Sequence, residues 1–422
     1  MSYWFTDPAL KGLLPLALSS SIQGLQTVFN TPQIIMGSNV FPEGPVIGPS
    51  TVDFLTARSL SKRTFVVTDE FAERFAKRVV QCLSNAGFEC QIWNGALPEV
   101  PMNNVKECAR VMSEFEPGLI VAVGGGSVID GAKAAWILYE RPDITDLFTL
   151  SPLEPIGLRK KAVLAAVPTT SGTGSEVTAV SVLHDVEAHR KVPIAGGELL
   201  PDFAILCPEF TMTMPPKLTV GTGLDALTHA IDSVTTPSGN ELTDALGLAA
   251  IEMVFKYLPR AYVNGQDREA RHRMIMAATT AGISFGNAGA CLPHSFGHSL
   301  GSLFNIHHGL AVGIFIPYVL QFYAQVSDKY LAIARVLRME GKTKEESLFN
   351  LVSKVRALFK ELDVPLSLKD LDIPADKFEE KMEKLVLYAY EDIDTFFTPR
   401  PITMAQAEQI FRYAYEGKDI DF

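Results

Sequence analysis

The chain has 422 residues with a formal net charge of −11 at pH 7, which argues against nucleic acids and anionic membranes as partners. Its length favours two domains, and its hydrophobic content of 47% is that of an ordinary soluble globular protein. The five cysteines are scattered and include no CxxC pair, so we expect free thiols and a cytoplasmic location.

Residues 1–28 contain an apolar stretch, LKGLLPLALSSSIQG, that resembles the core of a signal peptide. However, Asp7 precedes this stretch, Lys11 is its only basic residue, and no arginine occurs before Arg58, so neither a secretory nor a mitochondrial signal fits. No later segment reaches transmembrane length without charges. We therefore predict that residues 1–28 form a helical arm that packs on the body of the protein or on a partner subunit.

Between residues 29 and 213, short runs rich in β-branched residues alternate with helical segments. The pattern predicts strands at 63–69 and 90–95, a strand, glycine turn and helix at 117–139, and a buried strand followed by a loop at 161–180. This alternation is typical of parallel βαβ units. We therefore predict a Rossmann-like, parallel-sheet nucleotide-binding domain over residues 29–213.

The glycine turn of this domain is Gly124-Gly125-Gly126-Ser127, which follows a strand and opens a helix. Glycines let a backbone turn sharply and approach a phosphate, and the first turn of a helix offers free N–H groups. The alternative is a tight turn that binds nothing. The position of the glycine turn between a strand and a helix, with Asp130 three residues beyond Ser127, favours the phosphate site.

Two further strand ends carry polar residues. Asp69 ends the strand at 63–69, where an acid can bind the ribose hydroxyls and favour NAD over NADP, or can simply cap the next helix. The loop Thr169–Glu176 is rich in hydroxyl groups and suits a diphosphate or a nicotinamide edge, although a plain surface loop has the same composition. Together with the glycine turn, these ends would line one crevice of an open α/β sheet.

After PPKLT (215–219) the chain changes character, and helical periodicity continues to its end. The predicted helices are 219–236, 241–262, 267–285, 309–340, 345–362, 376–392 and 403–416. We therefore predict an all-helical domain over residues 214–422.

The helical region contains a cluster of residues that could bind a metal ion. Asp225 and His229 are four apart in a helical segment, so their side chains share one face; His294 and His298 repeat this spacing, and His308 follows a short connector. Each residue alone would fit a structural role. A carboxylate with several imidazoles is a divalent-metal set, and no cysteine has the spacing of a Cys-rich zinc site. The set therefore predicts a metal centre.

These motifs resemble the iron-containing (group III) alcohol dehydrogenases, which have a dehydroquinate-synthase-like fold. The resemblance covers roughly residues 29–416. It rests on GGGSVIDGAK (124–133), PTTSGTGSE (168–176), LPDFAILCPEF (200–210), GLDALTHAID (223–232) and the H-x3-H-x9-H array from His294 to His308. It implies an active site in the cleft between the domains and a homodimer or larger homo-oligomer.

The resemblance also implies roles for individual residues. The metal ligands fall on Asp225, His229, His294 and His308, and His298 matches a non-ligand histidine that is a candidate for proton relay. The ribose-binding acid falls on Asp69. The other cofactor contacts fall on Gly125, Gly126, Ser127, Asp130, Thr169, Thr170, Thr173 and Lys191.

The activity implied is that of a metal-dependent, NAD-linked alcohol dehydrogenase or aldehyde reductase that acts on a small primary alcohol or aldehyde. The metal would be Fe(II), with Zn(II) as the alternative, and would act as a Lewis acid on the substrate oxygen. Hydride would pass to or from the nicotinamide, and His298 would exchange the proton.

Three positions depart from the family pattern. Val100 stands where the family often has an asparagine that contacts the cofactor, and Ser299 replaces a common proline. His307 replaces the proline that usually precedes the last metal ligand, so it competes with His308 for that role. The spacing of 14 residues from His294 favours His308.

Other functions remain open. A dehydroquinate-synthase-like lyase would share the fold, NAD and metal, but its anionic substrate requires basic residues near the metal. Those between residues 223 and 310 lie away from the ligand motifs: Lys256, Arg260, Arg268, Arg271 and Arg273. Hydride transfer between a hydroxyacid and an oxoacid is a further possibility. A non-catalytic assembly protein that binds metal or nucleotide would keep the fold without turnover.

Overall fold

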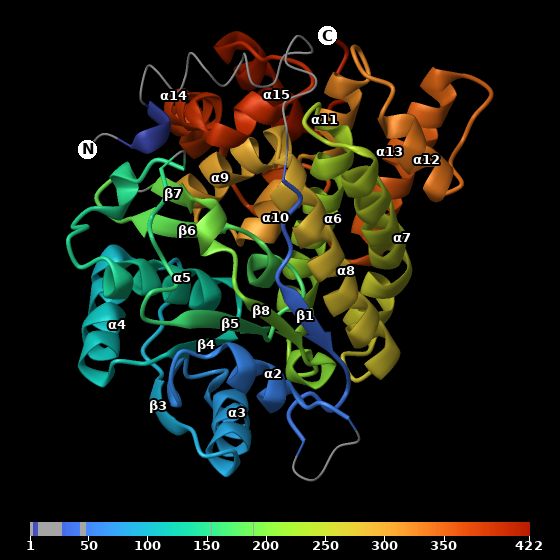
Figure 1. Cartoon of the computed structure of the whole chain (residues 1–422). Coiled ribbons are helices and arrows are strands. Elements are labelled where there is room, and N and C mark those ends of the chain that lie inside the picture. The colour runs from blue at the N-terminus through green and yellow to red at the C-terminus, as the bar shows by residue number, and fades with distance from the viewer. Residues whose placement is uncertain (1–2, 7–27, 43–47, 153, 189) are drawn as a thin grey trace. The chain divides into compact units, whose positions relative to one another are not determined.

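The computed structural model describes residues 3–6, 28–42, 48–152, 154–188 and 190–422 (Figure 1). The chain divides into two compact units, and the division in the body of the chain falls between Thr213 and Met214. Of the predicted N-terminal arm, Trp4–Thr6 form a short 3-10 helix, η1. Residues 7–27 of that arm lie outside the described part of the chain.

The first unit is built on a six-stranded sheet in which every pairing is parallel. Its strands are β1 (Gln33–Met36), β2 (Arg63–Thr68), β3 (Glu89–Trp93), β4 (Leu119–Gly124), β5 (Val163–Pro168) and β8 (Phe203–Leu206). They lie in the order β1-β8-β5-β4-β2-β3. All residues of β4 and β5 are buried, as expected where both faces of a parallel sheet are covered. The predicted Rossmann-like architecture is confirmed.

Helices cover both faces of this sheet (Figure 1). Leu55 of α2 (Thr51–Arg58) and Val79 of α3 (Glu73–Asn85) share one hydrophobic core with Val66 and Val121 of the sheet. Successive side chains of a strand point to opposite faces, so the neighbours of Val66 and Val121 face the other way. That second face is covered by α5 (Gly126–Glu140), which contacts β2, β4 and β5 and packs on α4 (Met102–Phe115).

An antiparallel hairpin, β6 (Val180–Asp185) and β7 (Arg190–Ala195), was not predicted from the sequence. The chain leading into it is held by Lys133 of α5, whose side chain is fully buried. The Lys133 ammonium donates hydrogen bonds to the carbonyls of Ser175, Thr178 and Val180 at 2.7, 2.8 and 2.7 Å. Burial lowers the pKa of Lys133 to about 8, against the opposing charges of Asp130 and Glu176. Lys133 is therefore a structural anchor.

The second unit is helical, as predicted. Its helices are α6 (Pro216–Thr235), α7 (Glu241–Val263), α8 (Arg268–Ala288), α9 (Leu292–Phe304), α10 (His308–Gly313), α11 (Ile316–Tyr323), α12 (Tyr330–Val336), α13 (Lys344–Glu361), α14 (Ala375–Glu391) and α15 (Met404–Glu416).

The single helix predicted at 309–340 is wrong, because this segment forms α10, α11 and α12. Pro317 lies in the first turn of α11, where a residue without an N–H is tolerated; inside one continuous helix it would remove a hydrogen bond. Two hydrophobic clusters fill the unit. One includes residues of α6, α7, α8 and α13, and the other residues of α9, α11, α14 and α15.

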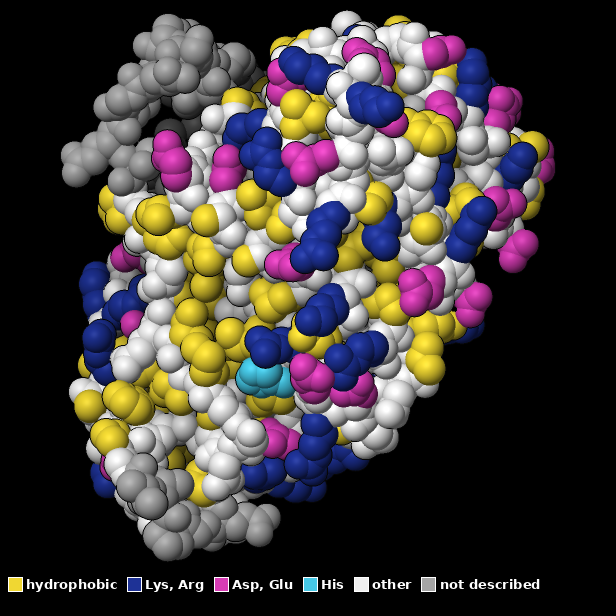
Figure 2. Space-filling view, turned by 90° about the vertical axis from the view of Figure 1, so that its right-hand side faces the viewer, with side chains coloured by type: hydrophobic (Ala, Val, Ile, Leu, Met, Phe, Trp, Pro, Cys, Tyr) yellow, Lys and Arg dark blue, Asp and Glu magenta, His cyan; other side chains and the backbone are white. Residues whose placement is uncertain are grey.

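The outer surface is mixed in charge. Figure 2 shows Lys and Arg side chains interspersed with Asp and Glu side chains over the face that it draws. The net negative charge is therefore not gathered into one patch on that face. Among the described residues no single helix is both long and apolar enough to cross a membrane, although the bent pair of α8 and α9 meets the same criteria.

We predict that Lys133→Met lowers the free energy of unfolding by about 3 kcal/mol, because each buried carbonyl left without a donor costs about 1–3 kcal/mol. The measurement is the midpoint of urea unfolding followed by circular dichroism. Lys106→Met, at an exposed position of α4, is the matched control and should change stability by no more than about 0.5 kcal/mol. Equal midpoints for the two variants would contradict the anchoring role of Lys133.

Candidate functional site

Helix α6 presents three polar side chains from one buried face. Asp225, His229 and Asp232 are separated by four and three residues, so they lie above one another on the helix. Their exposed fractions are 2%, 5% and 0%. Buried charges and imidazoles are costly unless they are paired or bind an ion, so this face must have partners.

Those partners come from α9 and α10, which lie beside α6 (Figure 1). The Asp225 Oδ1 atom is 3.9 Å from His229 Nε2, 3.9 Å from His294 Nε2 and 3.3 Å from His308 Nε2. Ligand atoms of Asp225, His229 and His294 all lie within 4.8 Å of one another. The structure thus brings together all four residues that the sequence indicated as metal ligands.

Glycines allow these helices to approach so closely. A Cβ atom on Gly309, the second residue of α10, would lie 1.9 Å from the carbonyl oxygen of Gly221 on α6. A Cβ atom on Gly297 of α9 would lie 2.4 Å from the Val312 side chain of α10. Any larger residue at either position would push α10 away. Gly309 therefore sets how near its neighbour His308 comes to Asp225.

The cluster fits a divalent metal ion. Asp225 Oδ1 and His294 Nε2 are buried and have no hydrogen-bond partner among the described residues. Protein ligands lie about 2.0–2.2 Å from ions such as zinc, so ligand atoms around one ion are roughly 3–4 Å apart, as found here. A carboxylate oxygen with three imidazole nitrogens suits Fe(II) or Zn(II). These unpaired atoms are the ones that an ion would use.

A second carboxylate, which was not identified from the sequence, holds one of these candidate ligands in place. Asp232 Oδ2 lies 2.7 Å from His294 Nδ1 and also accepts a hydrogen bond from the N–H of Cys291. A carboxylate on one ring nitrogen fixes the histidine tautomer and leaves the other nitrogen for a metal. Asp232 is the last residue of GLDALTHAID, seven residues after Asp225, and this helical spacing was the available signal.

The electrostatics of the cluster favour positive charge. Burial lowers the pKa of His294, but its contacts with Asp225 and Asp232 outweigh that effect and raise the pKa to about 10. Burial raises the pKa of Asp225, but the charges of His229 and His308 reverse this and hold it well below its usual range. A divalent cation supplies the same positive charge that these carboxylates attract.

His298, the predicted relay histidine, lies one helical turn after His294 and outside the set grouped around Asp225. Its ring stacks beside that of His308 with the centroids 5.2 Å apart. Its Nδ1 atom lies 3.0 Å from Asp392 Oδ2. Asp392 was not identified from the sequence, since it follows His298 by 94 residues with no shared motif.

The structure distinguishes His308 from His307. His308 Nε2 reaches to 3.3 Å from Asp225 Oδ1, whereas the His307 ring lies against the backbone of α6 at Gly221. A Cβ atom added to Gly221 would lie 2.5 Å from His307 Nδ1. His307 therefore packs against the helix one turn before Asp225.

In the first unit, the three predicted cofactor segments follow adjacent strands, since β5, β4 and β2 are neighbours in the sheet. Asp69 follows β2 and accepts a hydrogen bond from the N–H of Ala72 at 2.7 Å, so it does cap the next turn. Thr169 follows β5, and its N–H donates to the carbonyl of Gly124 at the end of β4. The carboxyl ends of these parallel strands thus form one edge, the usual place for a dinucleotide.

The glycine turn depends on the absence of side chains and not on positive φ angles. Gly125 has a φ of −75°, and none of Gly124, Gly125 and Gly126 has a positive φ. The absence of side chains matters because a Cβ on Gly126 would lie 2.6 Å from the Thr173 side chain, and one on Gly125 would lie 3.3 Å from that of Thr170. Helix α5 begins here with Ser127 in its first turn and without a side-chain cap.

Two of the predicted cofactor residues are used within the fold. Both carboxylate oxygens of Asp130 accept hydrogen bonds, one from the Ser175 hydroxyl and one from the Val182 N–H. The Lys191 ammonium, on β7, lies 3.1 Å from Glu99 Oε2. Asp130 therefore ties α5 to the hairpin, and a cofactor role for either residue stays a prediction.

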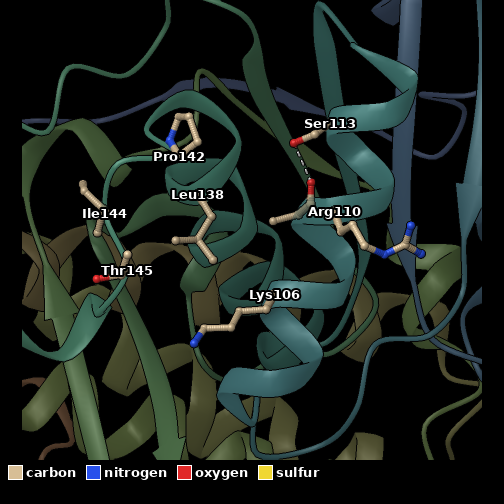
Figure 3. Close-up of a pocket in the computed structure, with 8 residues that line it drawn as sticks. Lys106, Arg110, Ser113, Leu138, Pro142, Ile144 and Thr145 are labelled. Carbon is tan, nitrogen blue, oxygen red and sulfur yellow. Dashed lines mark hydrogen bonds between the residues drawn. The ribbon is translucent and has the colours of Figure 1, made fainter.

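A surface pocket in the first unit lies elsewhere, between α4 and the end of α5 (Figure 3). Lys106, Arg110, Leu138 and Thr145 line it, and it includes none of the predicted site residues. Figure 3 shows the Arg110 guanidinium turned away from Leu138, and this group pairs with Glu107. The pocket therefore lacks the convergent polar groups of a binding site.

Two family models match the chain. One, described as iron-containing alcohol dehydrogenase, matches residues 45–208. The other, described as the C-terminal region of the Fe-containing alcohol dehydrogenase family, matches residues 219–415. Together they cover both units of the structure.

Individual proteins give the same result. The chain is 39% identical to the NADPH-dependent butanol dehydrogenase of Clostridium saccharobutylicum over 82% of this chain and 89% of that protein. It is 32% identical to aldehyde-alcohol dehydrogenase 2 of Entamoeba histolytica over 87% of this chain but only 45% of that longer protein. The solved structure of an iron-containing alcohol dehydrogenase from Thermococcus thioreducens is 31% identical, with a TM-score of 0.82 over 93% of this chain and 100% of that one.

We predict that His308→Ala abolishes metal retention, because it removes the imidazole nearest to Asp225 Oδ1. His307→Ala is the matched control, one residue away, and should leave the metal bound. The measurement is the metal content of each purified variant by inductively coupled plasma mass spectrometry. Equal metal content in the wild type and His308→Ala would show that His308 is not a ligand.

Proposed function

Because the chain belongs to the iron-containing alcohol dehydrogenase family, we propose that it transfers hydride between a small primary alcohol or aldehyde and NAD(H). The observation that carries this proposal is the cluster of Asp225, His229, His294 and His308, in which the buried atoms Asp225 Oδ1 and His294 Nε2 have no hydrogen-bond partner among the described residues. A structural role alone gives no reason to bury these atoms unpaired, since unpaired buried polar groups destabilise the fold.

In this proposal Asp225, His229, His294 and His308 hold one Fe(II) ion, with Zn(II) as the alternative. When bound, the ion supplies Lewis-acid polarisation of the substrate oxygen. Asp232 keeps His294 in the tautomer whose Nε2 faces Asp225. The protein therefore contributes fixed ligand positions in a largely buried site.

His298 is proposed to exchange the proton of the substrate hydroxyl. Its side chain is 13% exposed, compared with 3% for His294, so it is the more accessible of the two α9 histidines. Its Nδ1 atom is occupied by Asp392, which leaves Nε2 as the atom that accepts or donates the proton. Hydride passes to or from the nicotinamide, and this chemistry belongs to the cofactor.

The proposed cofactor is NAD, bound along the edge formed by Asp69, the glycine turn at Gly125 and Gly126, and the loop at Thr169–Thr173. The butanol dehydrogenase of Clostridium saccharobutylicum is named as NADPH-dependent, whereas we propose NAD for this chain. The support for NAD is Asp69, whose carboxylate at the end of β2 would repel a 2′-phosphate.

Two basic residues of the helical unit support a dehydrogenase over a lyase that binds an anionic substrate. Arg260 pairs with Asp267 and Glu269. Arg271 is 1% exposed and donates hydrogen bonds to the Met214 carbonyl and the Thr219 hydroxyl. Both guanidinium groups are thus already engaged, that of Arg260 in ion pairs and that of Arg271 in buried hydrogen bonds. An alcohol or aldehyde needs no such cation.

A homodimer or larger homo-oligomer and a cytoplasmic location remain part of the proposal. They rest on the family resemblance and on the free cysteines among the described residues.

We predict metal-dependent oxidation of NADH in the presence of small aldehydes. Apo protein should be reloaded anaerobically with Fe(II), Zn(II) or no metal and assayed by the loss of NADH absorbance against a panel of aldehydes. Turnover should require the metal, because in this proposal the bound ion polarises the carbonyl of the aldehyde. Absence of turnover across the panel, with metal and NAD bound, would contradict the proposed activity and favour the lyase.

We predict that Asp69→Gly relaxes the preference for NAD over NADP, because it removes the charge that repels the 2′-phosphate. Asp69→Ser is the matched variant: serine can still cap the N–H of Ala72 but carries no charge, so it should relax the preference as well. The measurement is kcat/KM for both coenzymes. An unchanged ratio in both variants would remove this role from Asp69.

A further inference from the structure

A carboxylate from the C-terminal part of the chain contacts the proposed relay histidine. Asp392 precedes the 3-10 helix η8 (Ile393–Phe397), and its Oδ2 atom lies 3.0 Å from His298 Nδ1. The two side chains are only 9% and 13% exposed. In such surroundings a hydrogen bond between a carboxylate and an imidazole is stronger than in water.

Asp392 is itself held rigidly. Its Oδ1 atom accepts a hydrogen bond from the N–H of Asp394 at 3.0 Å, which caps η8. The Thr395 hydroxyl of η8 lies 2.8 Å from the Ser295 hydroxyl of α9, and the Phe397 carbonyl lies 3.2 Å from Cys291 Sγ at the start of α9. The segment that carries Asp392 is thus fastened to the same helix that carries His298.

We propose that Asp392 is the positioning residue of His298: it accepts the Nδ1–H hydrogen bond, fixes the ring orientation and leaves Nε2 unprotonated to receive the substrate proton. This inference rests on the proposed function, in which His298 handles that proton. It assigns to Asp392 a role for His298 like the one that Asp232 has for the ligand His294.

The neighbouring Asp394 does not take this role. Its Oδ2 atom lies 3.8 Å from His298 Nδ1, beyond hydrogen-bond distance. Burial and the adjacent charge of Asp392 raise the pKa of Asp394 well above its usual range, so Asp394 competes little for the His298 N–H. Ligand atoms of His298, Asp392 and Asp394 lie within 4.8 Å of one another, so a second cation is the rival explanation that the experiment must exclude.

The decisive variant is Asp392→Asn. Its side-chain oxygen can still accept the Asp394 N–H, as Oδ1 does now, while its amide nitrogen replaces Oδ2 and points an N–H at His298 Nδ1. His298 Nδ1 must then accept, so the ring proton moves to Nε2 and the wrong tautomer faces the substrate. We expect kcat of the Fe-loaded full-length protein to fall about 100-fold, with KM for the aldehyde and the metal content unchanged.

Two further measurements separate positioning from a structural role. The solvent deuterium isotope effect on kcat should rise in Asp392→Asn, because proton transfer becomes rate-limiting. Asp392→Ser, which keeps a capping oxygen too short to reach His298, should also lower kcat. The matched control is Ser299→Ala, which removes the buried hydrogen bond from the Ser299 hydroxyl to the Leu385 carbonyl beside His298 but leaves Asp392 and its contacts in place, so its kcat should stay close to that of the wild type.

Three results would overturn the inference: wild-type kcat and isotope effect in Asp392→Asn, an equal loss of kcat in Ser299→Ala, or loss of a bound metal ion in Asp392→Asn. The last would make Asp392 a ligand of a second cation. Failure of the proposed function is distinct from all three, because it would appear as absence of metal-dependent turnover in the wild-type protein.

Discussion

The buried carboxylate of Asp225 is the constraint around which the helical unit is arranged. A charge with an exposed fraction of 2% is strongly destabilising unless positive partners surround it. Imidazoles from α6, α9 and α10 converge on its Oδ1 atom at 3.3–3.9 Å. The close approach of Gly309 to Gly221 brings α10 against α6 and places His308 beside Asp225. Packing and charge compensation therefore depend on the same few residues.

The two histidines of α9 are proposed to serve two different roles on one helix. His294 and His298 share a face, and each places Nδ1 against a carboxylate from a different segment, Asp232 of α6 and Asp392 before η8. Each ring is therefore held in one tautomer with Nε2 available. What separates the roles is distance from Asp225: His294 Nε2 lies 3.9 Å from its Oδ1, while His298 is not among the residues grouped with it. Position along the helix thus separates the proposed ligand from the proposed relay.

Features that depend on residues close together in the sequence could be predicted, and features that depend on distant residues could not. The parallel sheet and the pairs Asp225/His229 and His294/His298 were predictable, because strand alternation and helical spacing are local patterns. Asp392 was not, because its contact with His298 spans 94 residues and no periodicity links them. The break of residues 309–340 was missed although Pro317 was visible, because strong apolar periodicity outweighed one proline.

The first unit shows a further limit, since the side-chain contacts that a motif makes possible cannot be read from the motif itself. The glycine turn was identified, but its glycines have no positive φ and instead make room for the side chains of Thr170 and Thr173. This contact places the loop Thr169–Glu176, which follows β5, against the first turn of α5. Ser175 of that loop is in turn held by Asp130 and Lys133. The residues that resemble a phosphate-binding motif in the sequence therefore have two structural roles. The glycines make room for the loop Thr169–Glu176, and Asp130 and Lys133 hold Ser175 of that loop to α5.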